Sequence, residues 1–423
     1  SRQSKEAWPP LAPCGGLGMP GLDYSRFDHL DVSDDEEGAA TESREEPQDT
    51  AKLLSELPPE LSPDLSLVLA ARQGQKNIVE ALLDSRASPN AQDPHGASAL
   101  LRAVEGGIAS RPIIELLLSR RASVDLASAT GETPLRAAAV HGPAELCTAL
   151  LEAAPYGLGE AARGSALLSA AAAGNAATLR CLLEGSGHAV AVAADSDGRT
   201  ALHHYVGKGV GADLGLLESL LIARADLDAR DSSGATPLMD AAKKGSACPA
   251  VVRWLCEHNA TVDLAAADGG TALARAAEAG DEEVLRVLLE HHASPEGHLG
   301  ALPTEGGSSR KAASPLVAAT CAGHRGAMSL LLTARAAPDA ADGTGRRPLP
   351  CAAVSGDLAL CRLLIESRAG VNERGTSGAT VGDCVGGGVT ALSMAAAGGD
   401  VRLAELLLGA RADPELVDER GCS

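Results

Sequence analysis

Residues 195–204 read DSDGRTALHH, and their pattern returns at residues 231–242, DSSGATPLMDAA. Each copy begins with an Asp- and Gly-containing turn, and each continues through Thr into a run that contains Ala and Leu. Internal repetition of this kind is the signature of a repeat architecture, and the pattern continues on both sides of these copies. A Leu followed seven residues later by Gly occurs in ten units: Leu67 and Gly74, Leu100 and Gly107, Leu135 and Gly142, Leu167 and Gly174, Leu202 and Gly209, Leu238 and Gly245, Leu273 and Gly280, Leu316 and Gly323, Leu349 and Gly356, Leu392 and Gly399.

The residues around each Leu predict a short helix. A Ser or Thr suited to an N-cap lies two positions before most of these leucines. These residues are Ser98, Thr133, Ser165, Thr200, Thr236, Thr271, Ser314 and Thr390. In three units Pro follows the hydroxyl residue, as is common at the first position of a helix. The Gly predicts the end of the helix, because Gly enters the left-handed conformation without a side-chain penalty. A second helix in each unit is indicated by paired leucines, as at Leu150 and Leu151 or Leu288 and Leu289.

These turns, caps and spacings resemble the ankyrin family, whose unit of about 33 residues is a β-turn plus two helices with the signature T-P-L-H-x-A. The resemblance predicts an all-α fold, an ankyrin-repeat solenoid of about ten helical hairpins with projecting β-turn loops, over residues 59–423. Two inserts that interrupt the period, near 302–311 and at 375–388, are predicted to be surface loops.

Two departures from the family pattern affect stability. The family's His after Leu occurs only at His203, so we expect the hydrogen bonding between loops that this His usually supplies to be largely absent. Other residues fill its place in other units, among them Arg136, Met239, Ala274 and Ser393. The Gly that follows the second helix is replaced by Arg86, Arg121, Arg224, Arg335, Arg368 and Arg411, with Asn259 and His292 in register. A cation there complements the helix dipole, whereas a left-handed Arg costs about 1 kcal/mol.

Composition excludes several classes of protein. Aromatic residues make up only 1% of the chain against 45% hydrophobic residues, which suits thin layers of Ala and Leu better than one large core. The formal net charge of -20 argues against nucleic acid or an anionic membrane as partner. No uninterrupted apolar run is long enough to predict a membrane span.

The cysteines and histidines show no pattern typical of a metal site or an active site. None of the ten cysteines forms a C-x-x-C pair, and their positions inside predicted helices favour a reducing, intracellular and cytoplasmic location. The pairs His203-His204 and His291-His292 lack a third ligand at suitable spacing. No hydrolase, metalloprotease or phosphate-loop motif occurs, since Gly207-Lys208-Gly209 lacks the following hydroxyl. We therefore predict no enzyme activity, no metal and no cofactor.

Residues 1–58 are rich in Pro, Gly, Asp and Glu, have no helical period and are predicted to be a disordered acidic segment. Within it, residues 22–37, LDYSRFDHLDVSDDEE, resemble the N-terminus of the kinase-specific co-chaperone of the large heat-shock chaperone. The resemblance implies a casein kinase II site at Ser33, with Glu36 as its acidic determinant. Tyr24 and Phe27 favour a short binding motif, and the alternative is a solubilising acidic tail.

The fold predicts a scaffold or adaptor that binds other proteins on the concave face formed by loops and first helices. Two alternatives are a regulatory ankyrin segment of a larger truncated enzyme or channel, since residues 418–421 restart the loop pattern, and a chaperone-linked adaptor acting through residues 22–37. The predicted protein-binding site is a basic surface that receives an acidic segment of the partner. Its residues are Asp197, Arg199, Lys208, Ser233, Met239, Lys243 and Lys244. The alternative is that the cations among them are solvated ends of helices. The oligomeric state is left open by the sequence.

Overall fold

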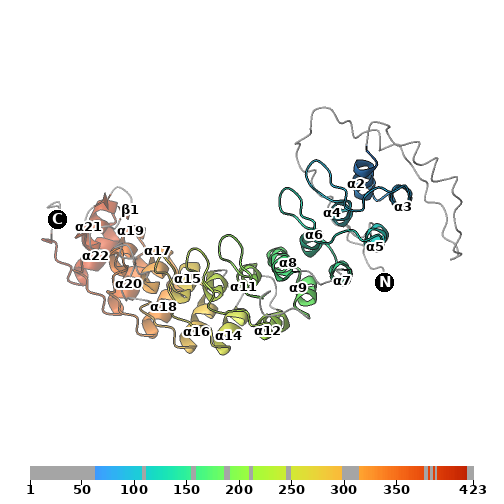
Figure 1. Ribbon diagram of the computed structural model, residues 1–423. Helices are drawn as coiled ribbons and strands as arrows, with labels where there is room; N and C mark the ends of the chain where they lie inside the picture. The colour runs from blue at the N-terminus through green and yellow to red at the C-terminus, as the bar shows by residue number, and fades with distance from the viewer. Residues whose placement is uncertain are drawn as a thin grey trace, which may run out of the picture. The chain divides into compact units, whose positions relative to one another are not determined.

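The computed structural model describes residues 62–106, 111–153, 159–184, 191–208, 213–243, 249–297, 314–375, 380–381, 384–385 and 388–416. Within these ranges the chain forms helical hairpins that follow one another in sequence order (Figure 1). The first helices of the hairpins are α2 (Pro63–Gln73), α4 (Ala99–Glu105), α6 (Pro134–His141), α8 (Glu160–Ala173), α11 (Ala201–Gly207), α13 (Pro237–Lys243), α15 (Ala272–Ala279), α17 (Pro315–Cys321), α19 (Pro348–Ser355) and α21 (Ala391–Gly398).

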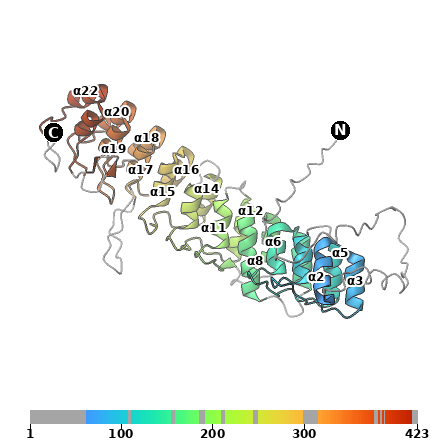
Figure 2. The same cartoon turned by 90° about the horizontal axis from the view of Figure 1, so that it is seen from above.

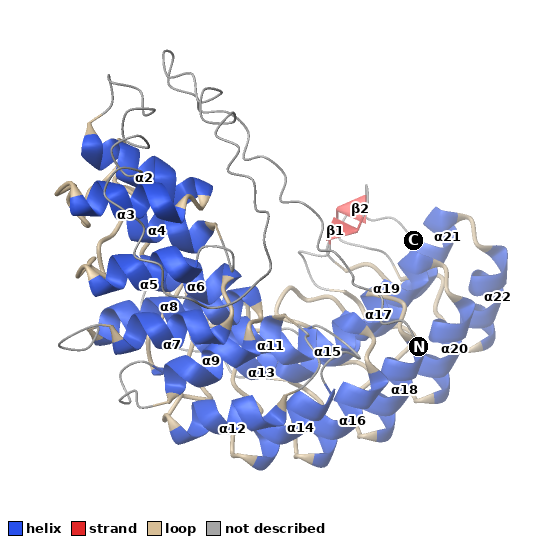
Figure 3. Cartoon of the chain, turned by 90° about the vertical axis from the view of Figure 1, so that its right-hand side faces the viewer, coloured by secondary structure: helices blue, strands red, loops and turns tan. Residues whose placement is uncertain are grey.

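Each first helix is followed by a second helix that turns back along it. These second helices are α3 (Lys76–Asp84), α5 (Arg111–Ser119), α7 (Ala144–Glu152), α9 (Ala176–Leu183), α12 (Leu214–Ile222), α14 (Pro249–Glu257), α16 (Glu282–Glu290), α18 (Arg325–Thr333), α20 (Leu358–Glu366) and α22 (Val401–Gly409). The described part of the chain thus holds ten hairpins, and the predicted all-α solenoid is confirmed. Figures 2 and 3 show the first helices in one row and the second helices in another, because helices of the same kind in neighbouring hairpins pack against each other.

Four of the eight predicted N-cap residues make the expected side-chain bond, and Ser314 stands at an N-cap position without one. The side chains of Ser98, Thr133, Thr271 and Thr390 each accept a hydrogen bond from a backbone amide three residues on. Ser165 is an exception, because α8 extends back to Glu160 and places Ser165 inside the helix rather than at its start. Gly74, Gly174, Gly280, Gly356 and Gly399 end their helices in the left-handed region, as predicted. Gly142 does not, since its φ of -90° and ψ of 160° are extended.

The core is a series of thin layers of Leu and Ala between neighbouring hairpins. The first helix α15 packs against α13 before it and α17 after it, and second helices pack in the same way. Leu238 and Leu273, the leucines of the repeat in α13 and α15, are 1% and 0% exposed. Because each hairpin buries its apolar face only against its neighbours, stability is distributed along the array rather than concentrated in one core.

The chain adopts a left-handed conformation immediately after the second helices. In the described residues, eight non-glycine residues have a positive φ, with values between 60° and 71°. They are Asn259, His292 and six arginines: Arg86, Arg121, Arg224, Arg335, Arg368 and Arg411. The prediction that these residues replace a left-handed Gly is confirmed. Each places an exposed side chain at the same corner of its hairpin.

Two series of hydrogen bonds join successive units. Backbone amides of Ala129, Ser232 and Ala267 donate to carbonyl oxygens of the preceding loop at 2.9, 2.7 and 2.7 Å. A second series joins the units after their second helices, where an Asp or Asn side chain accepts an amide of the next unit, as from Ser123 to Asn90 (2.7 Å) and from Thr261 to Asp228 (2.8 Å). His203 bonds to the next loop through the carbonyl oxygen of Ala235, and backbone groups supply bonds between units where that histidine is missing.

The second insert contains a two-stranded antiparallel pair, β1 (Thr380–Val381) and β2 (Cys384–Val385), drawn in red in Figure 3. The first insert, near 302–311, lies outside the described residues, and so does the predicted disordered segment 1–58. Among the described helices, none is long and apolar enough to cross a membrane.

Candidate functional site

The predicted binding residues lie on two successive loops and on the helices α11 and α13 that follow them. In each loop an Asp carboxylate organises the turn. Asp195 accepts the amides of Asp197 and Arg199, both at 2.9 Å, and Asp231 accepts those of Ser233 and Ala235, also at 2.9 Å. Burial alone would raise the pKa of both carboxyl groups, but the donated hydrogen bonds outweigh it, and the pKa of each is below its ordinary value.

The two loops are also bound to each other. The amide of Ser232 donates to the carbonyl oxygen of Asp197 at 2.7 Å. Gly198, with a φ of +74°, permits this approach, because a Cβ at that position would lie 3.2 Å from the amide nitrogen of Ser232. Asp197 and Ser233 therefore occupy neighbouring exposed positions on a surface held in place by backbone contacts.

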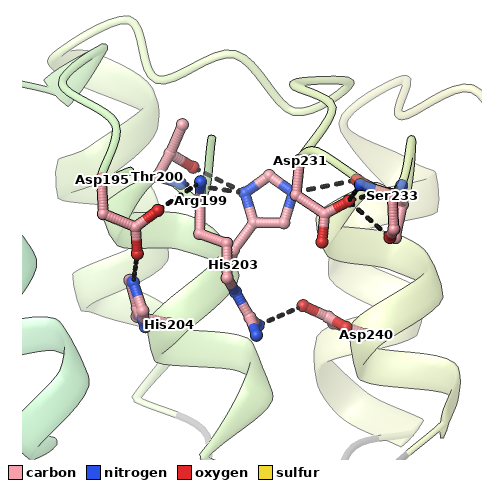
Figure 4. Close-up of polar contacts among 9 residues, drawn as sticks. Asp195, Arg199, Thr200, His203, His204, Asp231, Ser233 and Asp240 are labelled. Carbon is pink, nitrogen blue, oxygen red and sulfur yellow. Dashed lines mark hydrogen bonds and ion pairs between the residues drawn. The ribbon is translucent and has the colours of Figure 1, made fainter. Parts of the chain in front are cut away.

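His203 connects the two units from below the loops (Figure 4). Its Nδ1 accepts the amide of Thr200 at 3.2 Å, and its Nε2 lies 3.2 Å from the carbonyl oxygen of Ala235. Because an amide can only donate and a carbonyl can only accept, the ring is the neutral tautomer with its proton on Nε2. The side chain is 0% exposed, and this burial lowers its pKa although the bond to Ala235 opposes the shift.

The predicted basic spot is weaker than the sequence indicates. Arg199 forms an ion pair with Asp240 of the next unit at 2.5 Å, so its charge is locally compensated. His204 pairs with Asp195 at 2.7 Å. Figure 4 shows that the Arg199–Asp240 contact crosses to the next unit, whereas the His204–Asp195 contact stays within one unit. Asp240 was missed because it stands 41 residues from Arg199 in the chain, and only the stacking of hairpins brings the two together.

Of the remaining predicted residues, Lys208 and Lys243 are exposed at the ends of α11 and α13. No ion pair of either lysine is found within the described part of the chain. Met239 is only 2% exposed, so its predicted place on the surface is wrong: the position after the repeat Leu faces the neighbouring hairpin. Lys244 and Ser33 lie outside the described residues, and their roles stay predictions. The surface that the structure leaves available is formed by Asp197, Lys208, Ser233 and Lys243, which we call the central surface.

The described residues hold no group of three or more His, Cys, Asp or Glu side chains arranged to bind a metal ion. His203 and His204, which are adjacent in sequence, point to different partners and share no ligand position. The polar groups of this region therefore hold the loops and helices in place, and the exposed ones are available to contact a second molecule.

The stacked hairpins, the projecting loops and the left-handed corners together define the class of protein as a helical repeat solenoid. The chain belongs to the ankyrin-repeat family: a model of ankyrin repeats in three copies matches residues 67–158 and 204–297, and a model of ankyrin repeats in many copies matches residues 349–408. The resemblance of residues 22–37 to a co-chaperone lies outside these matches and stays a prediction.

Two known proteins show the extent of the likeness. The ankyrin repeat and KH domain-containing protein mask-1 of Caenorhabditis elegans is 29% identical over 251 residues, which is 58% of this chain. That match spans only 9% of the length of mask-1. The crystal structure of the human ASB11 ankyrin repeat domain is 23% identical, with 59% of this chain and 98% of that chain covered and a TM-score of 0.45.

Proposed function

We propose that this chain is a scaffold or adaptor that binds a partner protein on its loops and first helices, and that the central surface receives an acidic segment of that partner. Ankyrin repeats in general mediate protein–protein interaction. The finer proposal rests on one observation: Lys208 and Lys243, exposed at the ends of α11 and α13, form no ion pair within the described residues, whereas Arg199 is paired.

The local charge of the central surface, and not the net charge of the protein, carries this proposal. The net charge of -20 supplies no general attraction for acidic molecules, so only a local basic patch can supply it. Exposed lysines contribute little to affinity individually, but a pair on a fixed surface steers encounter and sets orientation. An acidic segment that lies along the loop tips would also receive hydrogen bonds from Ser233. The proposal includes an intracellular location, which the six free cysteines of the described residues fit.

The test uses peptides rather than an unknown cellular partner. A displayed library of random peptides is selected on the purified chain, and the affinity of enriched peptides is measured at several salt concentrations. We expect acidic residues to be enriched, and Lys208→Glu with Lys243→Glu to weaken binding about tenfold and flatten its salt dependence.

The matched control reverses two exposed arginines of second helices, Arg362→Glu with Arg402→Glu, which changes the net charge equally. We expect this variant to bind enriched peptides like the wild type. Selected peptides without acidic bias, or equal losses in both double variants, would show that the central surface is not the docking site.

A second proposal is that the array is a regulatory segment of a larger protein. It is supported by the mask-1 match, which spans 9% of that relative's length. An antibody raised against the array would then detect a native protein much larger than 42.6 kDa. A single native band near that mass would oppose this proposal and leave the scaffold proposal standing.

A further inference from the structure

Three arginines stand at the same corner of three successive hairpins. Arg335, Arg368 and Arg411 each follow the end of a second helix by two residues, after α18, α20 and α22. Their φ values are 69°, 68° and 69°, and all three side chains are exposed. The three positions thus repeat one backbone geometry, and we call them the arginine corners.

The guanidinium groups of the arginine corners have no carboxylate partner among the described residues. None of them forms an ion pair or a side-chain hydrogen bond there, although the exposed Glu366 lies only two residues before Arg368. An arginine on an earlier second helix differs, because Arg253 of α14 pairs with Glu290 of α16 at 3.4 Å. The three corners therefore present charges that the described part of the chain does not neutralise.

Arginine is an unfavourable residue for the backbone of these corners. The left-handed conformation strains any residue with a Cβ, whereas Gly adopts it without that strain. A cation does complement the dipole at the C-terminal end of a helix. The fold nevertheless accepts a neutral residue, because Asn259 occupies the same corner after α14 with a φ of 67°. A strained cation that the fold does not require points to a functional role of its side chain.

The packing of the second helices sets the spacing of the arginine corners. Helix α18 packs against α20, and α20 packs against α22 (Figure 3). Packed helices lie about 8–10 Å apart, so successive corners of the same geometry are separated by about the same distance. A polyproline II segment has three residues per turn and rises about 3.1 Å per residue, so every third side chain faces the same way about 9 Å further on. The period of the corners therefore matches that of an extended chain.

We propose that the arginine corners bind an extended segment of a partner protein that carries an Asp or Glu at every third position. Each carboxylate meets one guanidinium, whose planar fork suits two parallel hydrogen bonds. The net charge of -20 opposes a long polyanion such as nucleic acid or an anionic membrane, whereas a short segment is attracted mainly by the nearby cations. The corners share no residue with the central surface, so this inference does not depend on the proposed function.

The first experiment measures binding of a labelled peptide, Glu-Pro-Pro repeated three times, to the full chain by fluorescence anisotropy at low salt. The control peptide has the same composition with its three Glu residues adjacent. We expect the repeating peptide to bind about fivefold more tightly, and its affinity to fall as salt is added. Equal affinities of the two peptides would overturn the three-residue period. Tighter binding of single-stranded DNA than of the repeating peptide would overturn the choice of partner.

The second experiment removes the cations with residues that suit the left-handed backbone: Arg335→Gly, Arg368→Gly and Arg411→Gly. We expect this variant to keep the circular dichroism spectrum of the wild type and to bind the repeating peptide about tenfold more weakly. The matched control removes three exposed arginines from the same second helices: Arg325→Gln, Arg362→Gln and Arg402→Gln. Its affinity should stay within about twofold of the wild type.

Two outcomes of the second experiment would overturn the proposal. One is an equal loss of affinity in the Gly variant and the matched control, and the other is no loss in the Gly variant. Lys208→Glu with Lys243→Glu should leave binding of the repeating peptide unchanged, which separates this result from the test of the central surface. A loss in that double variant alone would place the peptide on the central surface and would also overturn the proposal.

Discussion

His203 offers the sharpest test of how neighbouring units are coupled. His203→Ala leaves the amide of Thr200 and the carbonyl of Ala235 without their partners, at a position where the side chain is 0% exposed. A buried polar group that loses its partner costs roughly 1–3 kcal/mol, and two such groups predict a loss of about 3 kcal/mol. A loss of this size is large for a single substitution in a repeat array, because each unit is stabilised by its contacts with neighbouring units.

The control is the adjacent residue. His204 is partly exposed and makes one ion pair with Asp195, so His204→Ala is expected to cost no more than about 1 kcal/mol. Urea unfolding followed by circular dichroism gives the free energies, and hydrogen exchange over residues 195–207 and 231–243 shows whether the loss is local. Similar losses in the two variants, or a loss below about 1 kcal/mol for His203→Ala, would refute the reasoning.

The same residue predicts a pH dependence with a definite sign. Burial holds the folded pKa of His203 below its ordinary value of 6.5, so between these two values the unfolded chain binds a proton that the folded chain does not. Stability is therefore expected to fall as pH drops below about 6.5, and His203→Ala should remove this part of the fall. The lowered pKa values of Asp93, Asp195 and Asp231 act only near and below their ordinary value of 3.8.

Three further changes test other parts of the description. Leu238→Asp buries a charge at a site that is 1% exposed and should unfold its hairpin and neighbours while distant units persist, which limited proteolysis would show; a melting curve like that of the wild type would contradict this. Arg224→Gly should raise the free energy of unfolding by about 0.5 kcal/mol, because relief of the left-handed backbone exceeds the added freedom of the unfolded chain, and a lower urea midpoint would oppose it. Ser33, outside the described residues, should be phosphorylated by casein kinase II, and mass spectrometry of the incubated chain checks this.

Local sequence patterns are enough to place the hairpins, several of their caps and the left-handed corners. These features depend on local backbone preferences, so Thr271, Gly280 and Arg224 could each be placed from their spacing to a neighbouring Leu. The repeat period also located the loops that carry Asp197 and Ser233. A pattern that recurs ten times fixes the register of each unit without knowledge of its neighbours.

Contacts between units follow only from the tertiary structure. The ion pair between Arg199 and Asp240 and the burial of Met239 both depend on how successive units pack. The repeat period predicts the order of the helices. Which residue of the next hairpin a side chain contacts depends on how the two hairpins pack. The charge available near the central surface is a property of the stack, because Arg199 is paired with a carboxylate of the next unit.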